Sequence, residues 1–493
     1  MNLNPGILPN IAAGTSTSGS MGASDFDGIA SLYKALEAGY GTDVSTLTGG
    51  AALRIQSLEM TMLSTIQENK HFALFNELAK TNATATVDEW TEQSSVGGFL
   101  GGSTNTETGN INNAQGVYNR RVGLVKYLMT RREVSFVTTL GNNLVGSEAV
   151  EQQNGALQLL TDAEFLSFEG DSNTVPTEYD GIRSQIVNAV NAGTIDGTHV
   201  VDAQATSLNS VTLISKAAAE IAAYGNFGTP THLFMSQLCQ SDFDTGLDPA
   251  FRVPLTDMPN GGISIGSPVV GIRTSWGNIK TVPDVFVRDG EQMLPFELSF
   301  PTIAAANTFV PAGVTVDASA TDASSMFAGV SVGLYYWYVV GVNNAGQSTG
   351  VMTAQTAVAA GKKVTLTISK SVAGTETGYV IYRSRVGGTN ALADLRQIPV
   401  RIPATGATTV YTDYNRDIPG TTTAYVLNMS PGAKAITWRQ LLPMLKFPLY
   451  PTQAATVPWA QLLFGYLRIG KLKHHVVIKN VLPNGAPWRP FNV

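Results

Sequence analysis

Apolar and polar positions follow two periods along this chain, and the period changes several times. Helical spacing, with apolar residues three and four positions apart, predicts helices at 51–80, 147–168, 182–193 and 213–225. A shorter amphipathic pattern at 26–39 cannot form a stable helix alone, so it must dock onto another surface. Short apolar runs between turn residues predict strands at 231–236, 265–274 and 277–287. Helices and strands mixed in this way predict an α+β fold.

The stretch 89–121 interrupts these patterns. Its sequence, EWTEQSSVGGFLGGSTNTETGNINNAQGVYNRR, is rich in Gly, Ser, Thr and Asn and contains no lysine. Extended patterns flank it, with ATATVDEW before and YNRRVGLVKYLMTRREVSFV across its end. An outward strand, a glycine-rich tip and a returning strand predict a long two-stranded arm. Because an isolated hairpin is marginally stable in water, this arm predicts a neighbouring subunit that stabilises it.

The composition changes at about residue 302, where the chain becomes rich in Thr, Val, Ala, Gly and Tyr. Short alternating runs such as YYWYVVGV, KKVTLTIS, GYVIYRSR and AYVLN follow, separated by turn signals such as NNAGQS and RDIPG. Strands at this spacing predict a β-sandwich that extends to about residue 428. After residue 430 the chain becomes apolar and basic, which predicts that the sandwich is inserted into the α+β part.

Charge adds two constraints. Only 14% of the 493 residues are charged, which is low for a globular protein and favours an assembly over a free monomer. The net charge is −6, yet residues 431–493 hold eight Lys or Arg and no Asp or Glu. Such a basic segment could touch nucleic acid, but internal or intersubunit charge pairing is the more frequent reason for it.

Nothing in the chain predicts a secreted or membrane protein. The single cysteine, Cys239, excludes an intrachain disulfide, and the N-terminus lacks a charged and apolar signal sequence. The uncharged stretch 326–342 is at the short limit for a membrane helix, and its Gly, Val and Tyr content favours buried strands. We therefore expect a soluble protein without membrane contacts.

No catalytic or metal-binding constellation stands out. The pattern G-x-S-x-G occurs at 262–266 and 329–333, but neither copy follows a buried strand and opens a helix, as a nucleophile elbow requires. His474 and His475 are adjacent, and adjacent residues of a strand point to opposite faces. The acids of DFDTGLD, 242–248, lack the glycine and glutamate of a calcium loop and predict a turn. We expect neither an enzyme nor a cofactor nor a metal.

The order of these segments resembles that of the major capsid proteins of tailed bacteriophages, which have the HK97-like fold. Four stretches look like parts of that family: 163–186, 231–244, 271–287 and 436–481. Within the insertion, LYYWYVVGVNNAGQS and GYVIYRSRVGG are similar to strands of immunoglobulin-like or fibronectin type III modules. The resemblance implies an α+β capsid fold with an inserted all-β sandwich.

The resemblance also implies a division of the chain. The expected parts are an N-terminal arm at 1–50, a helical segment of the peripheral domain at 51–84, an extended E-loop at 85–135, a spine-helix region of the peripheral domain at 136–170, an axial domain at 171–301, the immunoglobulin-like or fibronectin-like insertion at 302–428, and closing strands of the axial and peripheral domains at 429–493.

As a capsid protein, the chain would be a structural component of the virion, assembled in the host cytoplasm. Copies would form pentamers and hexamers of an icosahedral shell around double-stranded DNA, with a portal and with separate scaffolding or decoration proteins. Some relatives crosslink a loop lysine to an asparagine of another subunit. No lysine lies between Lys80 and Lys126, so we expect a non-covalent lattice. No cleavable segment is visible before the arm, so we expect no N-terminal maturation cleavage.

Six residues of the loop and its base are candidate intersubunit residues: Phe99, Leu100, Arg120, Arg121, Arg131 and Arg132. The arginines could pair with acids on a neighbour, or they could simply be solvated. Two other functions stay open. A phage tail-tube or adhesin protein would form tubes or fibres and would not need a long helix. A hydrolase with a β-sandwich appendage would need an acid, a histidine and a serine brought together.

Overall fold

The computed structural model of the chain describes residues 68–111, 113–140, 146–246, 269–288, 308–451 and 455–491. The predicted arm at 1–50, the helical pattern at 51–67 and the G-x-S-x-G copy at 262–266 lie outside these residues. The rest of the pattern 51–80 differs from the prediction. It holds a five-residue helix and then a strand that begins at Lys80, because residues 80–82 pair with a strand from the far end of the chain.

The α-helices of the described residues are α3 (Ala73–Glu77), α4 (Phe136–Leu140), α5 (Ser147–Glu169), α6 (Ile182–Asn191), α7 (Val211–Ala222) and α8 (Gln237–Gly246). Single 3-10 turns are η3 (Asn69–His71), η4 (Gly197–His199), η6 (Gly329–Ser331), η7 (Leu392–Asp394), η8 (Pro431–Ala433) and η9 (Leu472–His474). The helices α5, α6 and α7 confirm three of the predictions. Within the described part of the chain, no helix is both long and apolar enough to cross a membrane.

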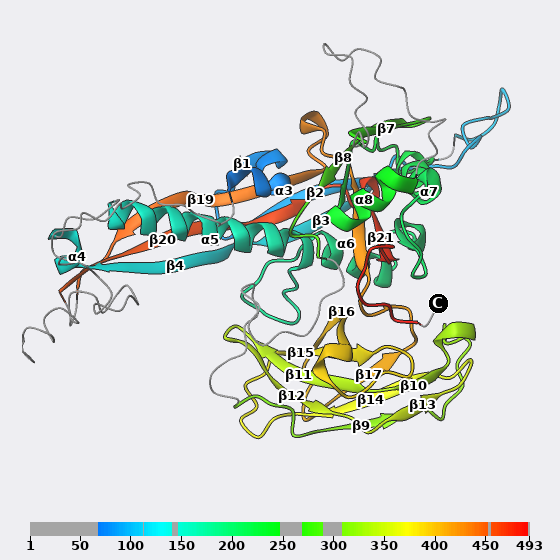
Figure 1. The fold of residues 1–493 in the computed structure, drawn as a ribbon. Coiled ribbons are helices and arrows are strands. Elements are labelled where there is room, and N and C mark those ends of the chain that lie inside the picture. The colour runs from blue at the N-terminus through cyan, green and yellow to red at the C-terminus, as the bar shows by residue number, and fades with distance from the viewer. Residues whose placement is uncertain are drawn as a thin grey trace, which may run out of the picture. The chain divides into compact units, whose positions relative to one another are not determined.

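The long helix α5 lies along one face of a four-stranded sheet (Figure 1). The strand order is β1 (Lys80–Asn82), β19 (Ile436–Pro448), β20 (Thr456–Ile469) and β4 (Lys126–Ser135). Only the β1–β19 pair is parallel; the other neighbours are antiparallel. The core between α5 and this sheet contains Leu159, Trp438 and Leu463, all of them buried. Segments more than 300 residues apart in sequence are therefore neighbours in this layer.

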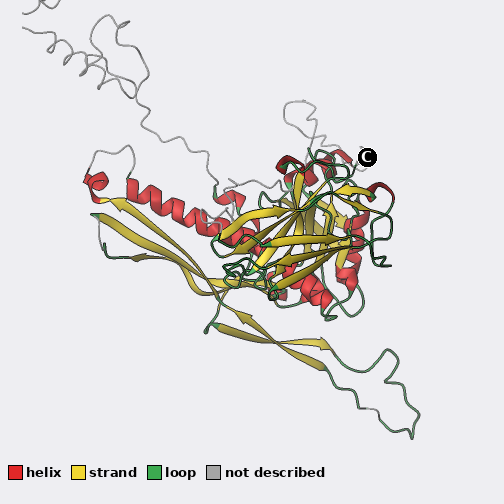
Figure 2. Cartoon of the chain, turned by 90° about the horizontal axis from the view of Figure 1, so that it is seen from below, coloured by secondary structure: helices red, strands yellow, loops and turns green. Residues whose placement is uncertain are grey.

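The predicted two-stranded arm is present as a ribbon of β2 (Val87–Ser95) and β3 (Val117–Leu124). These strands are antiparallel and pair with each other and with no other described strand. Figure 2 shows that the ribbon extends away from the other sheets and ends in a long loop. The returning strand was expected to be continuous, but it breaks at Val125, a buried residue. The paired arm thus spans 87–124, and residues 126–135 belong to the four-stranded sheet.

A six-stranded mixed sheet forms the central layer of the α+β part. Its order is β5 (Val200–Asp202), β21 (Val476–Val481), β18 (Thr422–Leu427), β6 (His232–Met235), β8 (Gly277–Pro283) and β7 (Gly271–Thr274). The apolar face of α7, with Ile214 and Ile221, packs against Leu233, Val426 and Ile478 of this sheet. The strands predicted at 231–236, 265–274 and 277–287 all occur here. The predicted α+β fold is confirmed.

Residues 308–413 form an all-β unit with its own core. The strand order of its four-stranded sheet is β12 (Gly346–Met352), β11 (Trp337–Asn343), β15 (Gly378–Ser384) and β16 (Leu395–Pro403). The order of its three-stranded sheet is β17 (Thr408–Asp413), β14 (Val364–Ser369) and β9 (Gly313–Asp317), and a small third sheet pairs β10 (Gly333–Tyr335) with β13 (Thr356–Val358). Trp337, Leu366 and Ile381 meet in the shared core. The apolar stretch 326–342 is thus largely β-structure, as its composition indicated, and its β11 part is buried.

One predicted strand of the insertion lies elsewhere. AYVLN was expected to belong to the sandwich, but it forms most of β18, which is hydrogen-bonded between β21 and β6 in the central sheet. The sandwich strands therefore end at Asp413, before the predicted limit of residue 428. Alternation could not show this, because a strand buried on both faces is equally apolar in either sheet.

Candidate assembly surface

One carboxylate, that of Asp88, holds the base of the ribbon to the four-stranded sheet. Arg439 of β19 donates a hydrogen bond of 2.8 Å to each of its oxygens, and the Tyr466 hydroxyl of β20 donates one of 2.6 Å. A guanidinium nitrogen of Arg468 lies 3.7 Å from the same carboxylate, and that guanidinium also lies over the ring of Trp90. Burial acts to raise the pKa of the Asp88 carboxyl, but the hydrogen bonds from Arg439 and Tyr466 hold it below its usual value. The ribbon therefore leaves the sheet at a fixed point.

The far end of the ribbon is a polar loop that exposes several large apolar side chains. The side chains of Phe99 and Leu100 are 77% and 76% exposed. Val96 and Ile111, on the same loop, are also exposed. Gly97 has a φ of +90°, and a Cβ there would collide with the carbonyl oxygen of Gln115, so only glycine allows the strands to stay this close where the loop begins. We call residues 96–111 the ribbon tip.

Each of the four candidate arginines has an acidic partner in its own chain. The pairs are Arg120 with Glu89, Arg121 with Glu92 at 2.6 Å, Arg131 with Glu133 at 2.8 Å, and Arg132 with Glu151 at 3.3 Å. Arg120 and Arg131 lie largely in solvent, where an ion pair contributes little. The structure places Arg120 and Arg121 on the ribbon and Arg131 and Arg132 on β4, and each has an acid of its own chain nearby. Their pairing with a neighbour stays a prediction.

A second exposed apolar surface lies on the four-stranded sheet. Gln461 of β20 donates a hydrogen bond of 2.7 Å to the Gln152 carbonyl of α5, so its side chain faces the helix. Successive residues of a strand point to opposite faces, so its neighbours Ala460 and Leu462 face away from the helix. The sheet register aligns two rows on this outer face, Leu445–Leu462–Met129 and Phe447–Ala460–Arg131, with the Phe464–Tyr127 pair beside them. Met129 is 63% exposed and Tyr127 is 50% exposed, and Leu445 and Phe447 are exposed as well. We call these residues the outer sheet face.

Sequence reasoning missed the outer sheet face and Asp88. The alternation in KYLMTRREVS, residues 126–135, carried part of the signal, because it places Tyr127 and Met129 on one face of β4. The other half of the face comes from β19 and β20, and their register against β4 is a tertiary property.

Half of the eight basic residues of the C-terminal segment pair with acids of the same chain. Besides the Arg439–Asp88 pair, Lys446 contacts Glu148 at 2.6 Å and Lys479 contacts Asp417 at 3.2 Å. This is the internal charge pairing that the asymmetric charge distribution suggested first.

The weak catalytic and metal motifs take other structures. The GVSVG copy forms η6 and then enters β10, which is not a strand–turn–helix elbow. DFDTGLD was predicted to be a turn, but its first half is the last turn of α8, because Phe243 packs into the core. His474 and His475 are not strand residues, since they lie in and after η9; burial lowers the pKa of His475 to about 3. Among the described residues, no three possible metal ligands gather.

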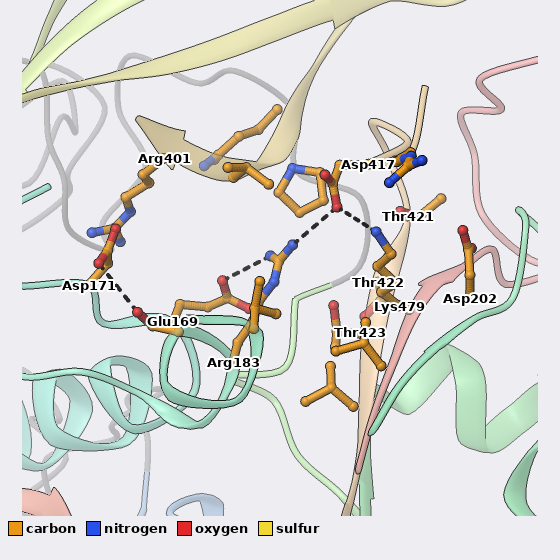
Figure 3. Close-up of a pocket in the computed structure, with 18 of the residues that line it drawn as sticks. Glu169, Asp171, Arg183, Asp202, Arg401, Asp417, Thr421, Thr422, Thr423 and Lys479 are labelled. Atoms are coloured by element: carbon orange, nitrogen blue, oxygen red, sulfur yellow. Dashed lines mark hydrogen bonds and ion pairs between the residues drawn. The ribbon is translucent and has the colours of Figure 1, made fainter. Parts of the chain in front are cut away.

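A cavity of about 790 Å³ lies where the all-β unit meets the α+β part (Figure 3). Its charged lining residues are Arg183, Arg288, Arg401, Arg416 and Lys479 with Glu169, Asp171, Asp202 and Asp417. Arg183 contacts Glu169 at 3.4 Å, and Lys479 contacts Asp417. Because its basic and acidic side chains nearly balance, the cavity favours neither an anion nor a cation. It lies between two parts of the chain and has a mixed polar and apolar lining.

The chain is similar to known phage proteins along most of its length. It is 24% identical over 454 residues to the major capsid protein of Staphylococcus phage S25-3, which covers 91% of this chain and 94% of that protein. The match to the major capsid protein of Staphylococcus phage K has the same identity over 455 residues. The resemblance to phage major capsid proteins is confirmed. Its immunoglobulin-like part stays a prediction.

Among solved structures, the chain aligns with the capsid of a native GTA particle at 9% identity and a TM-score of 0.45, covering 90% of this chain and 100% of that one. It aligns with the SrpI encapsulin of Synechococcus elongatus PCC 7942 at 8% identity and a TM-score of 0.39, covering 92% and 99%. No protein-family model matches the chain.

Proposed function

We propose that this chain is the major capsid protein of a tailed phage and that copies of it build the shell. The observation that carries this proposal is the match to two phage major capsid proteins over 91% of the chain. A match of this length takes in the ribbon and the long helix, because at most 9% of the chain lies outside it. The role is structural and not enzymatic, and the tail-tube or adhesin alternative has no comparable support.

The ribbon supports a specific mode of assembly. Its strands pair with no other described strand, and its tip exposes Phe99 and Leu100 to water. The outer sheet face exposes a patch of the same apolar character, with Met129 at its centre. Burial of a large apolar side chain is worth about 1.5–3 kcal/mol, so covering both patches at once is favourable. The ribbon tip of one copy therefore lies on the outer sheet face of the next.

This contact is heterologous, because it joins two different surfaces of the same chain. Heterologous contacts that close generate rings, and rings of five and six copies are the capsomers of an icosahedral shell. The contact is non-covalent, since the ribbon contains no lysine that could crosslink. The exposed pairs at Arg120 and Arg131 would lie at its rim and exchange acidic partners with the neighbour. The shell encloses double-stranded DNA and meets a portal and separate accessory proteins in the virion.

Two complementary variants test this function. The chain with Phe99→Ser and Leu100→Ser keeps the ribbon tip but loses two of its apolar side chains. The chain with Met129→Glu has a charge on the outer sheet face. We expect the unaltered chain to form rings or shells in negative-stain electron microscopy. Each variant should stay monomeric by sedimentation, because losing this burial weakens each contact at least about tenfold.

Mixing the two variants separates assembly from folding. The Met129→Glu chain keeps an intact tip and the Phe99→Ser, Leu100→Ser chain keeps an intact face, so the mixture should form 1:1 dimers but no shells. Thr104→Ser, in the same tip, serves as the control and should assemble normally. Shells from either variant alone would contradict the contact, and tubes from the unaltered chain would favour the tail-protein alternative.

A further inference from the structure

Two acidic side chains are buried together where three segments of the chain meet. Glu164 of α5 is fully buried, and its two oxygens accept hydrogen bonds of 2.7 Å from the backbone N–H groups of Leu74 and Phe75. These amides belong to the second and third residues of α3, so a carboxyl group of the long helix caps the first turn of a helix about 90 residues earlier.

Asp284 lies against the same carboxyl group. It follows β8, its N–H donates to the Met235 carbonyl at 2.9 Å, and its Oδ1 accepts from the Phe286 N–H at 2.8 Å. It is 1% exposed, and its Oδ2 has no hydrogen-bond donor among the described groups. The Glu164 carboxyl is its charged neighbour, and both acids also face the Leu74 N–H. The oxygen without a donor therefore points to a proton between the two acids.

Among the residues that the structure describes, no basic side chain pairs with either acid. Of the described ion pairs, none includes Glu164 or Asp284. On α3, Glu77 is turned to His232 and Lys280. The guanidinium of Arg288 lies over the ring of Phe165 of α5. The acids Asp162 and Glu178 act, like Glu164, on the hydroxyl of Tyr179. From the other side, the Tyr179 hydroxyl donates to the Ala163 carbonyl at 2.6 Å. Two buried carboxylates with no cation cannot both stay ionised.

We propose that Glu164 and Asp284 share one proton at neutral pH and act as a proton-dependent latch that holds α3 on α5 and β8. The latch joins the segment that leads into the ribbon, the long helix and the segment that leads toward the all-β unit. When the proton is lost, two adjacent buried charges repel each other, and the docking of α3 opens.

The direction of the pH effect follows from the same geometry. Burial, and next the charge of Asp284, raise the pKa of Glu164 from 4.5 to about 9, and burial also raises the pKa of Asp284. An unfolded chain loses this proton near pH 4.5, whereas the folded chain keeps it. The stabilisation is therefore complete below pH 4.5, declines as the pH rises, and is lost as the pH passes about 9.

Hydrogen exchange of residues 72–79 tests the latch on the unassembled full chain, so the result does not depend on the proposed function. After division by the intrinsic exchange rate, the amides of Leu74 and Phe75 should be best protected near about pH 5. From there to about pH 9 their exchange should rise by up to about tenfold for each pH unit, and above about pH 9 it should level off. Peptides of α7, which does not carry the latch, should not follow this profile.

Two variants remove the need for the proton. In Glu164→Gln the amide donates to Asp284, and in Asp284→Asn the amide donates to Glu164, so both should give a flat profile from pH 6 to 10. Glu107→Gln, an equal change on the ribbon tip, should keep the profile of the unaltered chain. A flat profile in the unaltered chain, or an unchanged slope in both variants, would overturn the proposal.

Infrared difference spectroscopy gives a second readout that holds even if one variant folds poorly. At pH 7 the unaltered chain should show the carbonyl band of a protonated carboxylic acid. The band should disappear above pH 10 and should be absent from whichever of the two variants keeps the native circular dichroism. Without that band at pH 7, the two acids do not share a proton.

Discussion

At the scale of single residues, Asp88 decides how the ribbon is attached. Its carboxylate is surrounded by Arg439, Arg468 and Tyr466, all from strands near the C-terminal end of the chain. Its separation from Arg439 is 351 residues, so no local pattern could have indicated the contact. The carboxylate is largely buried, and removing it would leave two arginines facing each other without a counter-charge. Such uncompensated buried charges are the costly case among ion pairs.

We therefore expect Asp88→Asn to lower the free energy of unfolding by about 2–4 kcal/mol, because it breaks buried hydrogen bonds to charged groups. Urea unfolding followed by circular dichroism measures this change. Glu89→Gln is the matched control one residue away, where the partner Arg120 is exposed and the expected loss is below about 1 kcal/mol. Equal losses in the two variants would mean that Asp88 does not anchor the ribbon.

At the scale of elements, the ribbon and the sheet approach each other through a glycine. Gly123 of β3 faces the ring of Tyr466 of β20, and a Cβ at this position would collide with that ring. Tyr466 is buried and bonded to Asp88, so it has little room to move. The small residue therefore lets β3 cross close to the sheet before the chain turns at Val125 into β4. Glycine in a strand often marks such a close approach of two segments.

Gly123→Ala should destabilise the chain by about 1–3 kcal/mol, the usual cost of inserting a methyl group into a packed site. It should also increase the hydrogen exchange of β2 and β3, because the ring of Tyr466 must turn away from Asp88. Gly313→Ala in β9 is the control, since a Cβ there meets no atom within 4 Å. A neutral result for Gly123→Ala together with unchanged exchange would show that the ribbon base is not closely packed.

At the scale of the whole molecule, the all-β unit has the features of a separately folding part. Its core centres on Trp337, and a fully buried ion pair joins Arg383 to Asp413 at 2.7 Å. The indole N–H of Trp337 donates to the same carboxylate at 3.2 Å. These contacts all lie within 308–413. Its link to the α+β part combines a small apolar cluster around Val175 with the Arg401–Glu178 pair at 2.8 Å beside the cavity.

We expect a fragment of residues 308–417 to fold alone and to unfold cooperatively on heating, as measured by circular dichroism and calorimetry. In this fragment, Asp413→Asn should cost about 3–5 kcal/mol, because it leaves a buried arginine unpaired, and that is a large part of a small domain's stability. Asp394→Asn, whose partner Arg385 is exposed, should have a much smaller effect. A fragment without a cooperative transition would show that the unit depends on the rest of the chain.

The sequence by itself determined the local features of this protein. The periods of its apolar positions gave α5, α6, α7 and most strands, because alternation and helical spacing report which face of an element is buried. The glycine-rich stretch between extended runs indicated the ribbon, and the low charge indicated an assembly. Phe99 and Leu100 were candidate intersubunit residues, and the structure shows both as exposed apolar side chains in a polar loop.

Only the tertiary structure decided which elements lie side by side. AYVLN joined the central sheet, β4 separated from the ribbon, and the four arginines took partners from their own chain. The Asp88 cluster, the Glu164–Asp284 pair and the outer sheet face each combine segments that are more than 50 residues apart. Periodicity shows which face of an element is buried but not which other element covers that face. Contacts of this kind are therefore fixed by packing and strand register alone.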